Sequence, residues 1–230
     1  MSMHEGHRQR LKGRFLESGM DGFTEVQVLE LLLFYSIPRK DTNPIAHRLL
    51  DRFGSLARVM DAPISELVKV EGVTENTAVL LKMQPAISRR YQISRSNDTE
   101  ILPTLDTCAE YLVPRFVGRT VETAFLLCMD ARCRVLCCRE VGAGAINSTT
   151  ISTRKILEIA ISSGASVVVL AHNHPSGLAL PSDQDKLTTK HLAAALRAAE
   201  IQLLDHIVVA DEDYVSMAQS GTEFNRYLLI

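Results

Sequence analysis

The chain has 230 residues, carries 25 Lys and Arg against 27 Asp and Glu, and is 46% hydrophobic, with a formal net charge of −2. This composition is typical of a globular protein and excludes a strongly acidic or basic low-complexity chain. No run approaches the roughly 18–20 apolar residues of a membrane-spanning helix, and the polar start lacks the apolar segment of a secretory signal, so we expect a cytoplasmic protein that does not enter membranes.

Helical spacing of apolar residues dominates the chain up to a polar segment at residues 94–100. Thr24 is suited to cap the start of one helix, and Gly54 is suited to end a later one. We therefore predict an α+β protein of two domains, with an all-α helical domain over residues 1–95 and a second domain over residues 101–221. The polar segment is expected to be the linker between them.

Residues 67–78, Leu-Val-Lys-Val-Glu-Gly-Val-Thr-Glu-Asn-Thr-Ala, are similar to a helix-hairpin-helix element. In such an element a glycine-rich turn lets backbone N–H groups at a helix N-terminus meet a DNA phosphate. Thr74 stands where the second glycine is expected, and Glu71 and Glu75 would repel a phosphate. Four nearby basic residues would attract one: Lys69, Lys82, Arg89 and Arg90. Weak DNA binding, packing and protein interaction therefore all stay open for the helical domain.

The second part of the chain alternates β-forming runs with amphipathic helices, which predicts an α/β or α+β domain with a mixed sheet. The predicted elements in chain order are a helix at 105–116, strands at 123–129, 134–138 and 145–151, a helix at 154–163, a strand at 167–171, a helix at 183–199, and strands at 202–210 and 214–217. The strand at 167–171 is apolar throughout, as is typical of a central buried strand.

The apolar spacing of one helix and the cysteines of this part predict which side chains are buried in its core. In the helix at 183–199, the spacing predicts one buried stripe: Leu187, His191, Leu192, Ala195 and Ala199. Five cysteines occur between residues 108 and 138, an odd number without the usual zinc-binding spacing. We expect their side chains to be small buried apolar groups rather than disulfides or metal ligands.

A candidate metal site follows the apolar strand. His172 and His174 lie two positions apart, so on a strand both side chains face the same side. Ser182 suits the N-cap of the next helix, which places Asp185 in its first turn, pointing back towards the loop. Two imidazole nitrogens and one carboxylate suit Zn²⁺ better than Fe²⁺ or Mn²⁺ and leave a fourth tetrahedral position for water. We predict one Zn²⁺ per chain.

Capping alone is the alternative interpretation of these residues. The histidines could merely end a strand, and Ser182-x-x-Asp185 could be only a capping-box helix start. The paired register of the histidines, the Pro-Gly turn after them and the helix start together favour the metal site.

The pattern His172-x-His174-Pro-x6-Ser182-x2-Asp185 resembles the JAMM (MPN-type) metalloprotease motif. The run His-Asn-His-Pro-Ser-Gly, followed by Leu-Leu-Asp-His-Ile-Val at residues 203–208, is similar to RadC-family proteins in particular, and the resemblance covers roughly residues 7–218. It implies a C-terminal JAMM/MPN domain with a cytidine-deaminase-like, three-layer mixed sheet, preceded by a helical region with a helix-hairpin-helix-like element.

The resemblance also implies an upstream glutamate, at Glu140 in the stretch Glu-Val-Gly-Ala-Gly-Ala, where Gly142 and Ala145 replace the usual Phe and Thr. In JAMM chemistry the metal lowers the pKa of a bound water towards about 7. Glu140 would take the proton of that water and deliver it to the leaving nitrogen, and Ser182 would stabilise the oxyanion. A solvated charge at a strand end is the alternative for Glu140.

The function predicted from this resemblance is a zinc-dependent, metallopeptidase-like hydrolase that cuts a peptide or isopeptide amide in an unidentified protein or peptide. The alternative is a non-enzymatic, DNA-repair-associated factor that binds DNA or protein and keeps a structural or vestigial metal site. An open three-ligand site favours the hydrolase, because structural zinc is normally closed by four protein ligands. Asp205 and His206 fit either a shell around the metal ligands or a buried structural pair. The sequence does not fix the oligomeric state.

Overall fold

The computed structural model describes residues 3–95, 100–144, 152–175, 177–211 and 213–220. It contains two compact units, which divide between Ile87 and Ser88. The domain limits predicted at residues 95 and 101 stay predictions. Ser94 and Arg95 belong to a helix, so the start of the predicted linker is helical, and residues 96–99 lie outside the described residues. Within the described ranges, no helix has the length and apolar character that a membrane crossing requires.

The first unit is helical, as predicted. Its elements are α1 (Met3–Ser18), α2 (Glu25–Leu33), α3 (Asn43–Phe53), α4 (Leu56–Asp61), α5 (Ile64–Leu67) and the first part of α6 (Glu75–Arg95). Thr24 caps α2 in a capping box with Gln27, and Gly54 ends α3 with a positive φ, as the sequence predicted. Five leucines at the centre of this unit are fully buried: Leu29, Leu33, Leu49, Leu67 and Leu81.

The predicted hairpin lies between α5 and α6 and turns at Gly72, whose φ is +91°. A Cβ atom added there would lie 2.8 Å from Cδ1 of the buried Ile45. The turn therefore needs glycine both for its left-handed backbone and for the close approach of α3.

Gly72→Ala is expected to lower the free energy of unfolding by about 2 kcal/mol, since left-handed strain adds to overpacking against Ile45. Gly54→Ala is a matched control, because Gly54 has the same φ of +91° but only ordinary contact around an added Cβ. Urea unfolding should show a larger loss for Gly72→Ala than for Gly54→Ala. Equal losses would contradict a contribution from the Ile45 contact.

Two of the basic residues near the hairpin, Lys69 and Lys82, make contacts within the protein. Lys82 donates from Nζ to the carbonyls of Met60 and Asp61, both at 2.9 Å, and so binds the C-terminal end of α4. Lys69 pairs with Glu66, a residue that also accepts from Arg52. DNA binding by this unit stays a prediction.

The second unit contains a mixed sheet, as predicted, with five strands among the described residues. Its elements after α6 are α7 (Leu105–Leu112), the 3-10 helix η1 (Val113–Phe116), β1 (Thr123–Met129), β2 (Val135–Ala143), α8 (Thr153–Ser162), β3 (Val167–Asn173), α9 (Asp183–Ala198), β4 (Gln202–Ala210) and β5 (Asp213–Ser216). The strand order is β2-β1-β3-β4-β5, and β3 and β4 are parallel while the other neighbours are antiparallel. The strand predicted at 145–151 lies outside the described residues.

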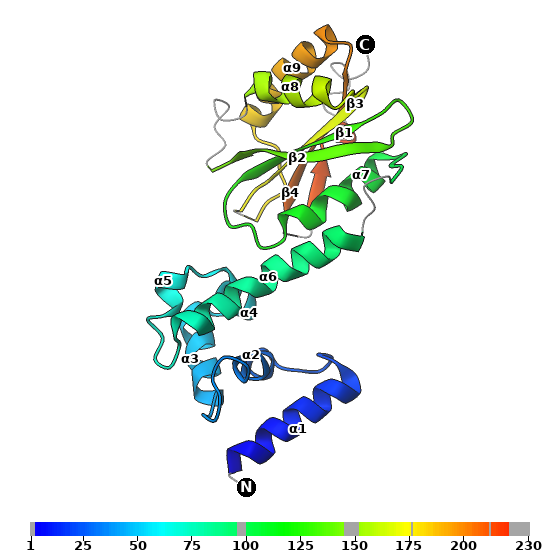
Figure 1. Cartoon of the computed structure of the whole chain (residues 1–230). Coiled ribbons are helices and arrows are strands. Elements are labelled where there is room, and N and C mark those ends of the chain that lie inside the picture. The colour runs from blue at the N-terminus through cyan, green and yellow to red at the C-terminus, as the bar shows by residue number, and fades with distance from the viewer. Residues whose placement is uncertain (1–2, 96–99, 145–151, 176, 212, 221–230) are drawn as a thin grey trace. The chain divides into compact units, whose positions relative to one another are not determined.

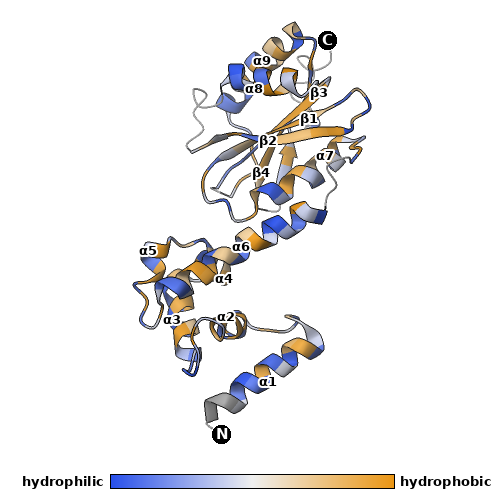
Figure 2. Cartoon of the chain, viewed as in Figure 1, coloured by the Kyte–Doolittle hydropathy of each residue, from blue (hydrophilic) through white to orange (hydrophobic). Residues whose placement is uncertain are grey.

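Helices cover both faces of this sheet (Figure 1). One core packs α8 and α9 against one face, and a second core packs α7 and η1 against the other. Every residue of β1 is buried, and its alternate side chains enter the two cores in turn. The central strands β1, β3 and β4 are accordingly the most hydrophobic part of this unit (Figure 2). Cys108 and Cys128 are buried as expected, and burial raises the pKa of both thiols to about 12, whereas Cys133, Cys137 and Cys138 are only partly buried.

The face of α9 that packs on the sheet differs from the predicted stripe. Its buried residues are Asp185, Thr189, Leu192, Ala193 and Leu196. Leu192 is buried as predicted and Ala195 and Ala199 are partly buried, but Leu187 is 47% exposed and His191 is exposed, so the prediction is wrong for these two residues. The predicted stripe left out two polar residues, Asp185 and Thr189, which occupy the buried face. Those two residues bring α9 to the candidate site.

Candidate metal centre

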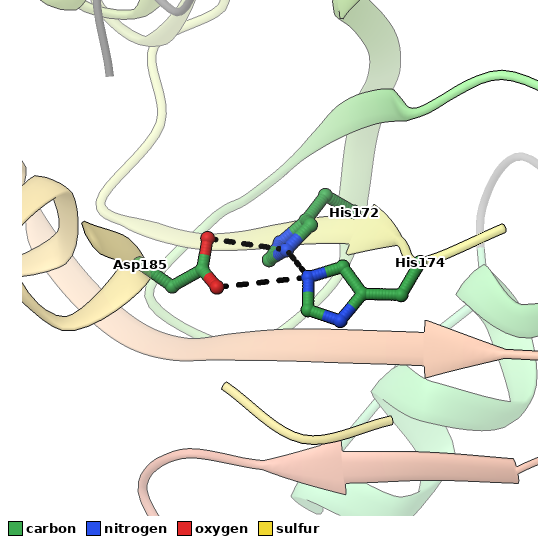
Figure 3. A group of neighbouring side chains, drawn as sticks. All are labelled: His172, His174 and Asp185. Carbon is green, nitrogen blue, oxygen red and sulfur yellow. Dashed lines mark hydrogen bonds and ion pairs between the residues drawn. The ribbon is translucent and has the colours of Figure 1, made fainter. Parts of the chain in front are cut away.

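Three side chains converge where β3 ends and α9 begins (Figure 3). The Nε2 atoms of His172 and His174 lie 2.9 Å apart. The Asp185 carboxylate faces both rings, with Oδ1 3.3 Å from Nε2 of His172 and Oδ2 3.6 Å from Nε2 of His174. The structure thus brings together the three residues that the sequence predicted as metal ligands.

The start of α9 holds the Asp185 carboxylate in place. Ser182 is the N-cap residue, and its Oγ accepts from the Asp185 backbone N–H at 3.1 Å. In return, Asp185 Oδ2 accepts from the Ser182 backbone N–H at 2.8 Å and from its hydroxyl at 2.5 Å. This is a complete capping box. The capping and metal-site interpretations of Ser182-x-x-Asp185 are therefore compatible, because the same carboxylate serves the helix and faces the histidines.

The loop after β3 fixes the ring of His174. Its Nδ1 lies 3.0 Å from the carbonyl oxygen of Leu178, and its backbone N–H donates to Val209 at 2.8 Å. Since a carbonyl can only accept, Nδ1 of His174 carries a hydrogen, which leaves Nε2 as the ring nitrogen that could bind a metal. Gly177 makes the turn possible with a φ of +86°. The Nε2 atom of His174 faces the cluster.

Behind the cluster, His172 contacts a second buried imidazole. His172 Nδ1 lies 2.7 Å from His206 Nε2, and His206 Nδ1 lies 2.6 Å from the Thr189 hydroxyl. Asp205, the neighbour of His206, binds other groups: its carboxylate accepts from the Ser216 hydroxyl and from the backbone N–H groups of His206 and Ala218. The sequence left two roles open for this pair, a shell around the metal ligands or a buried structural pair. His206 contacts a predicted metal ligand, whereas Asp205 binds the chain around β5.

Burial sets the protonation of these rings. It lowers the pKa of His172 to about 4; the Asp185 carboxylate opposes this shift and the neighbouring His174 adds to it. Burial, with His172 and His174 nearby, also holds the pKa of His206 well below its ordinary value. His172 and His206 are therefore neutral at pH 7, and neutral imidazole is the form that binds a metal ion.

The donor atoms fit a zinc ion. Zn–N bonds of about 2.0–2.1 Å at tetrahedral angles put neighbouring ligand atoms about 3.3 Å apart. The observed separations of 2.9, 3.3 and 3.6 Å span this value. Two lone pairs and a carboxylate directed at one point would repel one another without a cation between them. The cluster is therefore chemically suited to one metal ion.

Comparison with known proteins identifies the family of this chain. The sequence profile described as "RadC-like JAB domain" matches residues 102–222, more than half of the chain. This chain belongs to the RadC family. It is also 31% identical, over 225 residues, to a UPF0758 protein of Fusobacterium nucleatum, an alignment that covers 95% of this chain and 97% of the relative.

One residue predicted for this RadC site lies elsewhere. The Glu140 carboxylate pairs with Arg119 Nη2 at 3.0 Å, and Arg119 lies over the ring of Phe125. Glu140 is the register partner of Phe125, which packs in the core on the α7 side, whereas His172 is the partner of Ala124, which packs in the core on the α8 and α9 side. Since paired residues share a face, the structure does not bring Glu140 to the metal ligands. Its role as general base stays a prediction.

Sequence reasoning missed Thr189 altogether. Thr189 is fully buried and touches both His206 and the Asp185 backbone. Its position four residues after Asp185 puts it on the same face of α9, which is the signal that could have found it.

Proposed function

We propose that this RadC protein is a JAMM-type metal-dependent hydrolase that binds one Zn²⁺ at His172, His174 and Asp185 and hydrolyses an amide bond in a protein or peptide. The observation that supports the proposal best is the convergence of two imidazole lone pairs and a carboxylate on one point. Three protein ligands leave a position for water or substrate, as in catalytic zinc sites. When bound, the metal would supply a hydroxide near neutral pH and would polarise the substrate carbonyl.

The chain's own residues would support that chemistry in different ways. Burial keeps His172 neutral and ready to bind the metal. Ser182 is exposed at the start of α9 and donates its single hydroxyl hydrogen to Asp185, so it orients a ligand. Its role in stabilising an oxyanion is proposed on the family resemblance and requires this hydrogen bond to open. Glu140 is proposed as the general base on the family resemblance alone, and this role requires its pairing with Arg119 to open.

The Arg119–Glu140 pair also favours a second candidate function. A metal site without a carboxylate positioned for proton transfer fits a non-catalytic DNA- or protein-binding factor whose metal is structural. The two candidates differ in whether zinc-loaded protein hydrolyses anything, so activity separates them.

Glu140→Gln is expected to lower the rate of hydrolysis by about 10²–10⁴-fold, the usual contribution of a general base, while zinc content stays unchanged. The rate should be measured with zinc-loaded protein on panels of peptide and isopeptide-linked substrates. Arg119→Gln is the control, because it removes the ion pair and keeps the carboxylate. A rate unaffected by Glu140→Gln would remove Glu140 from the mechanism, and no hydrolysis by zinc-loaded wild-type protein on any panel would favour the non-catalytic factor.

A further inference from the structure

We propose that Thr189 and His206 are positioning residues, which set the hydrogens of the His172 ring so that its Nε2 atom is free to bind metal. The proposal rests on the metal site of the proposed function and deepens it. It concerns how the protein prepares that site before any metal arrives.

The Thr189 hydroxyl determines which atoms donate and which accept along this chain of hydrogen bonds. Its hydroxyl lies 2.5 Å from the backbone carbonyl oxygen of Asp185. Two oxygens this close repel unless a hydrogen lies between them, and a carbonyl oxygen only accepts, so the hydroxyl donates its single hydrogen there. The same oxygen can then only accept from His206 Nδ1, which lies 2.6 Å away. His206 therefore carries its hydrogen on Nδ1.

The ring of His206 links Thr189 to His172. This ring is 1% exposed, and the groups that contact its two nitrogens are a hydroxyl and another imidazole. With the hydrogen on Nδ1, His206 Nε2 has a lone pair and accepts from His172 Nδ1 at 2.7 Å. His172 is left with a bare Nε2, which faces Asp185 and His174.

The chain of hydrogen bonds joins two metal ligands from two elements. It begins at the backbone of Asp185 on α9, crosses β4 at His206 and ends at His172 on β3. Each of the side chains that it connects is buried. In the opposite direction the Thr189 hydroxyl would donate to His206, which would leave its oxygen 2.5 Å from the Asp185 carbonyl oxygen with no hydrogen between the two. The fold therefore selects one arrangement of hydrogens, and that arrangement suits metal binding through Nε2.

The carbonyl of Leu178 likewise sets the hydrogen of the His174 ring on Nδ1, but by a direct contact. His174 Nδ1 donates directly to Leu178 in the loop, whereas His172 lies on a buried strand and needs the side chains of Thr189 and His206. Partners of this kind typically change metal affinity by about 10–100-fold when removed. We expect an effect of that size for Thr189.

Thr189→Val tests the proposal, because valine keeps the shape of threonine and removes the hydroxyl. In metal-free wild-type protein, ¹⁵N NMR of the histidine rings should show His172 with its hydrogen on Nδ1; in Thr189→Val we expect a mixture of the two forms. Zinc affinity, measured by competition with a chelator, should fall about 10–100-fold. Thr189→Ser should restore both readouts. Thr188→Val, on the same helix but away from His206, should leave both unchanged.

Three results would overturn the proposal. The first is a wild-type His172 with its hydrogen on Nε2, and the second is an unchanged His172 ring in Thr189→Val. The third is an equal loss of affinity in Thr189→Ser and Thr189→Val, which would assign the effect to packing. Failure of the metal site itself looks different: wild-type protein would bind no zinc while His172 still carried its hydrogen on Nδ1, which would sink the proposed function and support the positioning roles.

Discussion

His172→Ala is expected to lose the bound zinc, which should fall from about one ion per chain to a trace after dialysis. Apparent binding free energies of about 10–16 kcal/mol at four-ligand zinc sites correspond to roughly 3 kcal/mol per ligand. Removing one of three protein ligands should therefore weaken affinity about 100-fold or more. His172 is the central member of the cluster, since its ring contacts His174, Asp185 and His206. Mass spectrometry of metal content gives the stoichiometry, and chelator competition gives the affinity.

His191→Ala is the matched control for this measurement. His191 lies on α9, the helix that carries Asp185, but its side chain is exposed. Zinc bound to His191→Ala should equal zinc bound to wild type. Full zinc occupancy in His172→Ala would place the metal at other residues, and wild-type protein that takes up no zinc when it is supplied would contradict the metal site.

Asp205→Ala is expected to lower the free energy of unfolding by about 3 kcal/mol, measured by urea denaturation. Asp205 is fully buried and its carboxylate accepts from Ser216 Oγ at 2.5 Å, from the His206 N–H at 2.7 Å and from the Ala218 N–H at 2.9 Å. Alanine would leave these donors without a partner, at a cost of roughly 1–3 kcal/mol each. Relief of the buried charge offsets part of this cost, because burial raises the pKa of Asp205 against the effect of its hydrogen bonds.

Asp213→Ala provides the comparison for Asp205→Ala. Asp213 begins β5 and is exposed, so its replacement should change stability by no more than about 0.5 kcal/mol. Similar losses in the two variants would show that the Asp205 carboxylate does not hold the chain around β5.

The three candidate ligands could be predicted because each follows a local rule. His172 and His174 share a side through the two-residue period of a strand, and Asp185 follows from the capping chemistry of Ser182. Both rules act within a few residues, so no knowledge of the remaining fold was needed. The apolar run of β3 likewise predicted a central strand.

The placement of Glu140 could not be predicted, because it depends on pairing between strands. The pairing of β1 with β2 shifts between Ala124 and Phe125, and a shift of one residue exchanges the two faces of a strand. The predicted strand also ended at residue 138, before Glu140 was reached. The face of α9 was missed for a different reason: apolar spacing does not register polar residues such as Thr189, whose burial depends on partners from β4.

The capping box at the start of α9 has a consequence for how such sequences are interpreted. Ser182 and Asp185 would remain useful to folding in a descendant that had lost its metal, since they would still satisfy N–H groups at the start of α9. Mutation could therefore erase the histidines long before the Ser-x-x-Asp pair. In relatives of this protein, retention of both histidines is the better sign of a working metal centre, and retention of Ser-x-x-Asp alone indicates only a well-formed helix.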